Sequence, residues 1–220
     1  MVYAYLSPSW FLGYDVVFEV AFAVISLVIA FFAFKIHKLS GQRQARLLGL
    51  SFFFISLSYF IQSIFNYFII LNSNQLLLSN QLFLLDFFGV YAHMIFMTAG
   101  LVTLVYMTFK IERTRLILFF SLTSLFAIFL SRTVLYSFYV MSTLYLAFIA
   151  WHFIKNYIDN KQTKTLLIAG AFILLFFGSA HFILAVDHQT FYVLGHFFEL
   201  FAYLLILLNL YLVIKGDPKA

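Results

Sequence analysis

Histidines and carboxylates are the side chains in this sequence that could bind a metal, hold a haem or transfer a proton. Four of them lie inside long apolar stretches, namely His93, His181, His196 and Glu199. An ionisable group placed in hydrocarbon costs about 2.5–3.5 kcal/mol or more, and it persists mainly where it is paired, hydrated or ligated. Each of the four is therefore a candidate site residue.

The spacing of these residues predicts that they share a pocket. His196 and Glu199 are three residues apart on one helix face, which suits two ligands of one metal ion or an acid–base pair. Asp86 and His93 are seven residues apart and also share a face. At 1.5 Å per residue, the shallower candidates lie roughly 5–9 Å below the outer ends of their helices, namely Glu19, Asp86, His181 and His196. His93 and Glu199 lie roughly 12–17 Å below them.

Other polar pairs extend this predicted pocket. Asp15 with Glu19, and Gln62 with Asn66, are four residues apart and face the same way along their helices. Small residues, which permit close helix approach or leave room for a ligand, flank the candidate histidines at Gly89, Gly178 and Gly195. We therefore expect a polar funnel that opens to the outside, built by the first, second, third, sixth and seventh spans.

The predicted function is redox or metal-dependent chemistry at this site. The metal ligands would be His93, His181, His196 and Glu199, and the cofactor-binding residues the same three histidines with Asp86. Nitrogen and oxygen ligands in a chain without cysteine favour zinc, iron, copper or manganese. Two of the histidines could instead hold one b-type haem, with the glycines accommodating the macrocycle. With a hydrated metal, Glu199 could act as the acid or base of a hydrolysis.

Other functions stay open at this point. The histidines could simply form a structural polar cluster, each hydrogen-bonded to a neighbouring helix. A seven-helix receptor or sensor that signals through a partner chain is the second hypothesis, because outward histidines titrate near physiological pH. A cation or proton transporter is the third, although the inner halves of the spans contain few ionisable groups. A retinal Schiff base cannot form, because the last span has no lysine before Lys215.

The elements that must position these residues are membrane-spanning helices. Of the 220 residues, 65% are hydrophobic, 10% are charged and 32 are phenylalanine, and a soluble domain has too little interior for that much apolar surface. A helical span needs about 20 mostly apolar residues. We predict an all-α, polytopic seven-helix bundle forming one domain over 1–220, with spans near 14–34, 47–71, 82–108, 115–131, 133–154, 164–185 and 190–214.

The basic residues predict the orientation of the bundle. If the N-terminus is outside and the C-terminus cytoplasmic, every lysine and arginine except Arg132 lies in a cytoplasmic segment, as the positive-inside rule requires. One helix merging the fourth and fifth spans is the alternative, but it would move Lys155, Lys161 and Lys164 outside. The first run lacks a positive segment before it and is followed by Lys35, which predicts a retained anchor.

These charges also indicate the surroundings of the protein. Cationic loops facing the cytoplasm lie against anionic lipid headgroups, so the positive net charge does not require nucleic acid as a partner. We expect a multi-pass protein of the plasma membrane whose main partner is the lipid bilayer. A cytoplasmic or membrane protein partner is expected if the chain is a sensor, and the sequence does not set the oligomeric state.

Overall fold

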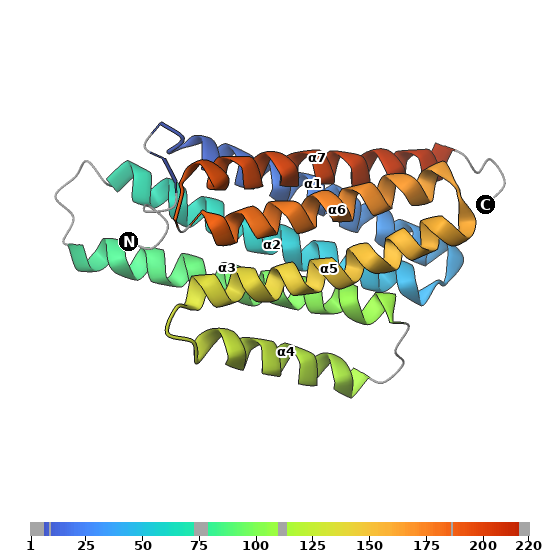
Figure 1. The fold of residues 1–220 in the computed structure, drawn as a ribbon, viewed down its shortest axis with the longest axis horizontal. Helices are drawn as coiled ribbons and strands as arrows, with labels where there is room; N and C mark the ends of the chain where they lie inside the picture. The colour runs from blue at the N-terminus through green and yellow to red at the C-terminus, as the bar shows by residue number, and fades with distance from the viewer. Residues whose placement is uncertain (1–6, 9, 73–78, 110–113, 186, 216–220) are drawn as a thin grey trace.

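A computed structural model describes residues 7–8, 10–72, 79–109, 114–185 and 187–215, without the side chains at 72, 79–83, 86, 114, 116 and 214–215. Over these ranges the chain forms seven α-helices and no strand (Figure 1). The helices are α1 Tyr14–Ser40, α2 Arg43–Asn72, α3 Ser79–Thr108, α4 Thr114–Phe129, α5 Val134–Asn160, α6 Thr163–Leu184 and α7 Thr190–Lys215. The predicted all-α fold class is confirmed for the described part of the chain.

Six of the described helices, α1, α2, α3, α5, α6 and α7, are long and apolar enough to cross a membrane. Some helices are longer than the predicted apolar runs. The capping residue determines where a helix ends, even where the residues before it are no longer hydrophobic. Gly41 and Lys161 adopt left-handed backbone conformations, with φ of 68° and 50°. Their N–H groups donate to the carbonyl oxygens of His37 and Tyr157 at 2.8 and 2.7 Å, which ends α1 and α5.

The fourth and fifth predicted spans are two separate helices, so the merged alternative is wrong. Phe129 ends α4 and Val134 begins α5. Ser131 stabilises the turn between them, because its Oγ accepts from the Thr133 N–H at 3.2 Å and from the Ser137 hydroxyl at 2.6 Å. With 16 residues, α4 is about 24 Å long, shorter than the roughly 30 Å hydrocarbon core.

Six of the helices close into a ring, and α4 lies outside it. Helix contacts run from α1 to α2, α3, α5, α6, α7 and back to α1. Among the described residues, α4 contacts only α3 and α5, and Figure 1 shows it along the side of the bundle. Any interior site must therefore be built by the six ring helices.

One end of the bundle carries nearly all the positive charge. Figure 1 shows α1 beginning and α7 ending at opposite ends of the bundle. We call the end at which α1, α3, α5 and α7 finish the basic end. At this end, the terminal two turns of the helices and the short segments beside them contain nine described basic residues, namely Lys35, Lys38, Arg43, Arg46, Arg115, Lys155, Lys161, Lys164 and Lys215. At the opposite end, Arg132 is the one described lysine or arginine.

The inward face of each helix follows from the three- to four-residue period. In α1 the buried positions include Asp15, Glu19, Phe22 and Ser26, spaced four, three and four residues apart. Intervening residues such as Val20 are exposed on the outside of the bundle. This periodicity turns one polar strip of α1 toward the ring interior while apolar side chains cover the outside.

Candidate functional site

The ring encloses an elongated cavity that is partly open to the surroundings. All six ring helices line it, and no described residue of α4 does. The lining residues are Glu19, Phe52, Ile55, Tyr59, Gln62, His93, Met97, Leu101, Leu104, Phe138, Tyr139, Ser142, Leu146, Leu175, Ser179, Phe182, Tyr192, His196, Glu199 and Tyr203.

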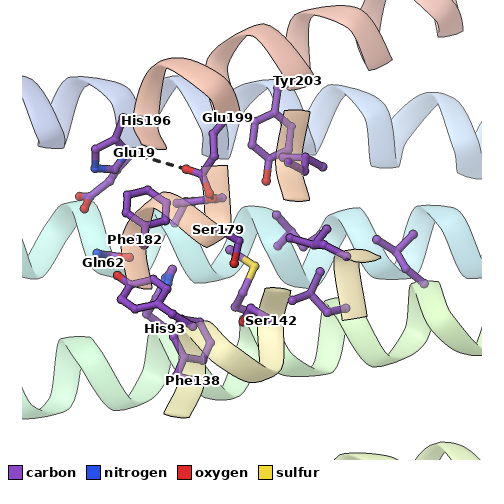
Figure 2. A pocket seen from close by; sticks show the side chains of 18 of the residues that line it. Glu19, Gln62, His93, Phe138, Ser142, Ser179, Phe182, His196, Glu199 and Tyr203 are labelled. Atoms are coloured by element: carbon purple, nitrogen blue, oxygen red, sulfur yellow. Dashed lines mark hydrogen bonds and ion pairs between the residues drawn. The ribbon is translucent and has the colours of Figure 1, made fainter. Parts of the chain in front are cut away.

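The two ends of this cavity differ in chemistry. Glu19, Gln62 and His196 lie together toward the end away from the basic end (Figure 2). Toward the basic end the same helices contribute aliphatic side chains, including Leu101 and Leu104. Because α3 runs toward the basic end, Leu104 lies eleven residues beyond His93, a distance of about 16 Å along the helix. The cavity therefore has a polar end and a long apolar end.

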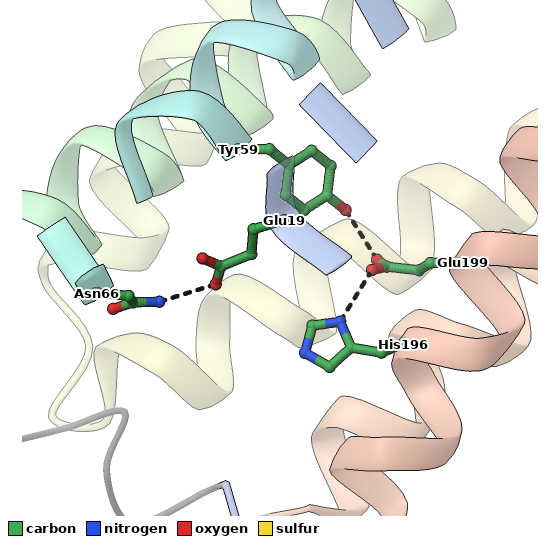
Figure 3. A network of polar contacts seen from close by, with 5 residues as sticks. All are labelled: Glu19, Tyr59, Asn66, His196 and Glu199. Carbon is green, nitrogen blue, oxygen red and sulfur yellow. Dashed lines mark hydrogen bonds and ion pairs between the residues drawn. The ribbon is translucent and has the colours of Figure 1, made fainter. Parts of the chain in front are cut away.

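Glu19 is the most deeply buried carboxyl group at the polar end. Its side chain has 0% of its surface exposed, and its Oε1 accepts from the Asn66 amide at 2.8 Å (Figure 3). Its Oε2 has no hydrogen-bond partner in the described part of the protein, and neither does Oε1 of the buried Gln62. Buried polar atoms usually have partners, so two unpaired oxygens lining one cavity mark a candidate binding site.

His196 and Glu199 contribute a second polar group from α7. The predicted co-facial pair is formed, with Nδ1 of His196 3.7 Å from Oε2 of Glu199. Oε1 of Glu199 accepts from the Tyr59 hydroxyl of α2 at 3.0 Å (Figure 3). Neither ring nitrogen of His196 has a hydrogen-bond partner among the described residues. Glu199 is thus fixed across the ring, while His196 keeps hydrogen-bonding capacity.

Aromatic rings surround His196 on several sides. Their centroids lie 4.6–6.0 Å from the imidazole centroid, and they belong to Phe11, Phe18, Phe22, Phe182 and Tyr192. Such rings exclude water and present faces of negative potential to a cation. At the polar end of the cavity, a few unpaired polar atoms are therefore surrounded by aromatic rings.

His93 is held in one orientation by Ser58 of α2. The serine Oγ lies 2.7 Å from Nδ1 of His93 and donates to the His93 carbonyl oxygen at 3.0 Å. Both side chains are buried, at 5% and 0% exposure. Ser58 thereby fixes the His93 ring where it lines the cavity.

The structure brings together part of the predicted ligand set. His93, His196 and Glu199 line the same cavity. His181 does not line it, because its ring N–H donates to the Phe177 carbonyl oxygen at 2.6 Å and its ring packs on Phe198 at 4.9 Å. Asp86 belongs to α3, but its side chain lies outside the described residues.

The side chains of the described residues contain no group of three or more His, Asp or Glu that could hold a metal ion. The glycines beside the candidate histidines were expected to leave room for a haem. At Gly178 and Gly195, neighbouring atoms occupy that space instead. A Cβ on Gly178 would meet the Gly195 carbonyl oxygen at 3.1 Å, and one on Gly195 would meet the Phe182 ring at 2.7 Å. These glycines serve close packing of α6 on α7. A bound metal or haem stays a prediction that this geometry does not support.

The sequence did not single out several residues of the cavity. Span five was absent from the predicted funnel, yet α5 contributes Ser142 and Tyr139. Tyr59 was also missed, although it lies three and seven residues before Gln62 and Asn66 and so shares their face. That spacing was the available signal for Tyr59. Ser142 offers none, because isolated serines recur throughout the apolar spans.

Comparison of the chain with protein-family models, with curated proteins and with solved structures gave no match. The inference of function therefore depends on the geometry of the cavity alone.

Proposed function

We propose that this chain is a multi-pass membrane protein that binds a small amphipathic molecule inside its helix ring and acts as a sensor of that molecule. One observation carries the proposal: a single cavity joins unpaired polar atoms at one end to an aliphatic tail region at the other. Ligand sites are commonly apolar clefts with a few convergent polar groups. A molecule with a polar head and an alkyl chain matches both ends.

The shape of the ring supports a role in sensing. All six ring helices line the cavity, so a bound ligand changes contacts on each of them at once. A ligand shifts a conformational equilibrium only through different contacts with the two states, and this arrangement provides such contacts. The chain would pass the resulting helix shift to a partner at the basic end.

Transport is supported less well than binding. A route for ions through the bundle needs polar groups toward both ends, since lipid and apolar side chains do not solvate charge. The lining near the basic end consists of side chains such as Phe52, Leu104 and Leu146. The cavity therefore resembles a binding site that ends among apolar side chains more than a conducting path.

We further propose seven crossings, with the N-terminus outside and the basic end in the cytoplasm. The positive-inside rule supports this orientation. The number of crossings is supported by α3 and α5, which both finish at the basic end, so the chain must return along α4 between them (Figure 1). The chain has no native cysteine, so single cysteines can report sidedness. We expect Gln42→Cys to react with an impermeant maleimide only after cells are opened, and Asp187→Cys in intact cells. The reverse pattern contradicts the orientation.

Binding of single-chain amphiphiles to the protein in lipid nanodiscs tests the proposed function. Decylamine, decanol and decanoate share one tail and differ in the head. We expect saturable binding of at least one of them above that of empty nanodiscs. Ser142→Phe places a ring in the cavity and should abolish it, whereas Leu144→Phe, on the exposed side of the same helix, should leave it unchanged.

A second variant maps the tail region. Leu104→Trp fills the apolar tip of the cavity, so it should prevent binding of the decyl probes. Probes with the same head groups and a shorter hexyl tail should still bind. Absence of saturable binding for all three decyl probes contradicts the proposed function. The same conclusion follows if Ser142→Phe and Leu144→Phe, both shown to be folded by their unfolding temperatures, bind equally well.

A further inference from the structure

We infer that the head group bound at the polar end is an organic ammonium, which a pocket of Glu19, Gln62 and aromatic rings would hold. This inference rests on the proposed function, because it names the chemistry of the ligand for the same cavity. It depends on the charge balance of the lining, on the unpaired atoms and on the aromatic surroundings.

The charge balance of the cavity favours a cation. Glu19 and Glu199 both line it, and none of its lining residues is a lysine or arginine. The carboxyl group of Asp15 is close enough to act electrostatically on Glu19. Asp15 itself is satisfied by the backbone, since its Oδ1 accepts from the N–H groups of Gly13 and Val16 at 2.8 and 2.9 Å. Carboxylates buried without a counter-ion are costly.

The two lining carboxylates are not equally satisfied. Glu199 has the Tyr59 hydroxyl as a donor and His196 beside it at 3.7 Å, and a proton on His196 would neutralise it. Glu19 has only a neutral amide donor, from Asn66. Its second oxygen has no partner within the described part of the chain. Glu19 is therefore the lining carboxyl group whose ionised form has no cationic partner among the described residues.

The unpaired atoms match an ammonium better than other heads. An ammonium offers three donors and no acceptor. Oε2 of Glu19 and Oε1 of Gln62 are unpaired acceptors, buried at 0% and 5% exposure. A hydroxyl head can donate only once, and a carboxylate head would repel Glu19.

The aromatic lining adds a second source of selectivity. Tyr192, Tyr139 and Phe182 line the same end of the cavity as Glu19. Faces of tyrosine and phenylalanine attract an ammonium through the quadrupole of the ring, and this attraction grows when water is excluded. A carboxylate bordered by aromatic rings can thus neutralise the charge of an amine and contact its alkyl substituents.

The decyl probes in nanodiscs test the inference directly. We expect decylamine to bind the wild-type protein at least about tenfold more tightly than decanol, as loss of a charged hydrogen bond implies. Glu19→Gln should remove this preference, lowering decylamine affinity at least about tenfold while changing decanol affinity less than about threefold. Asp187→Asn removes an exposed charge at the same end of the bundle and should leave both affinities unchanged.

The outcomes separate this inference from the proposed function. If decylamine and decanol bind equally and Glu19→Gln changes neither, the amphiphile site stands and the ammonium assignment is wrong. Stronger binding of decanoate contradicts the assignment too. If sodium or potassium ions displace decylamine at equal concentration, the site takes inorganic cations and the inference fails. If no probe binds saturably, the proposed function itself fails.

Discussion

Gly178→Val is expected to lower the free energy of unfolding by about 3 kcal/mol, the upper part of the usual range for overpacking. A Cβ at this position of α6 would lie 3.1 Å from the Gly195 carbonyl oxygen and 3.3 Å from Cγ of Glu199. Backbone on α7 cannot move aside as a side-chain tip can, so the two helices must separate. Because Glu199 moves with α7, decylamine binding should fall as well.

Gly170→Val provides the matched control for this prediction. Gly170 lies on the same helix, and its added Cβ would meet only Cδ1 of Leu205, at 3.9 Å. Since glycine is a poor helix former, valine here should change stability by less than about 0.5 kcal/mol. Reversible unfolding of both variants in detergent measures the difference. Equal destabilisation would contradict the assignment of Gly178 to a close helix contact.

Glu19→Gln is expected to stabilise the ligand-free protein while it impairs amine binding. A glutamine retains the oxygen that accepts from Asn66 and replaces an unpaired, buried carboxylate oxygen with a neutral amide. The substitution exchanges a buried carboxyl oxygen that has no partner among the described residues for an amide that can donate, so the free energy of unfolding should rise by about 1 kcal/mol. Functional sites commonly reduce stability in this way. Unfolding in the absence of amines measures the effect.

Glu199→Gln should have the opposite effect on stability. Its carboxylate already accepts from Tyr59 at 3.0 Å and lies 3.7 Å from His196, so the substitution weakens existing contacts. We expect its free energy of unfolding to fall by about 1–2 kcal/mol. If both substitutions destabilise the protein equally, then Glu19 is as well satisfied as Glu199 and the charge argument is wrong.

The sequence was sufficient to predict much of the fold. Long apolar runs separated by short polar segments predict all seven helices, because membrane thickness sets the length of a span. Five of them agree within four residues at both ends, and α1 and α5 continue six residues beyond their predicted ends. The positive-inside rule predicted the break between α4 and α5, because one merged helix would move Lys155, Lys161 and Lys164 outside. The closed ring could not be predicted, because the apolar outer surfaces of α4 and of the other helices are alike in composition.

The candidate site was predictable only within single helices. Helical spacing correctly placed His196 and Glu199 on one face, since that relation is local. The position of His181 depends on the rotation of α6, whose cavity-lining residues are Leu175, Ser179 and Phe182. His181 directly precedes Phe182 and is rotated about 100° from it. It therefore points along the seam between α6 and α7, where Phe198 packs on it.

Three of the predicted metal ligands, His93, His196 and Glu199, do line one cavity, and aromatic rings surround His196 there. Glu19 and Gln62 supply acceptors from two other helices. Such a lining suits recognition of an organic cation more than ligation of a metal, which needs several donors directed at one point.

An experimentally determined structure of the protein in nanodiscs with decylamine tests the central claim most directly. We expect continuous density within the six-helix ring, with the nitrogen beside the Glu19 carboxylate and the alkyl chain directed toward Leu104. Decylamine found only on the lipid-facing surface, with side chains closing the interior, would contradict it.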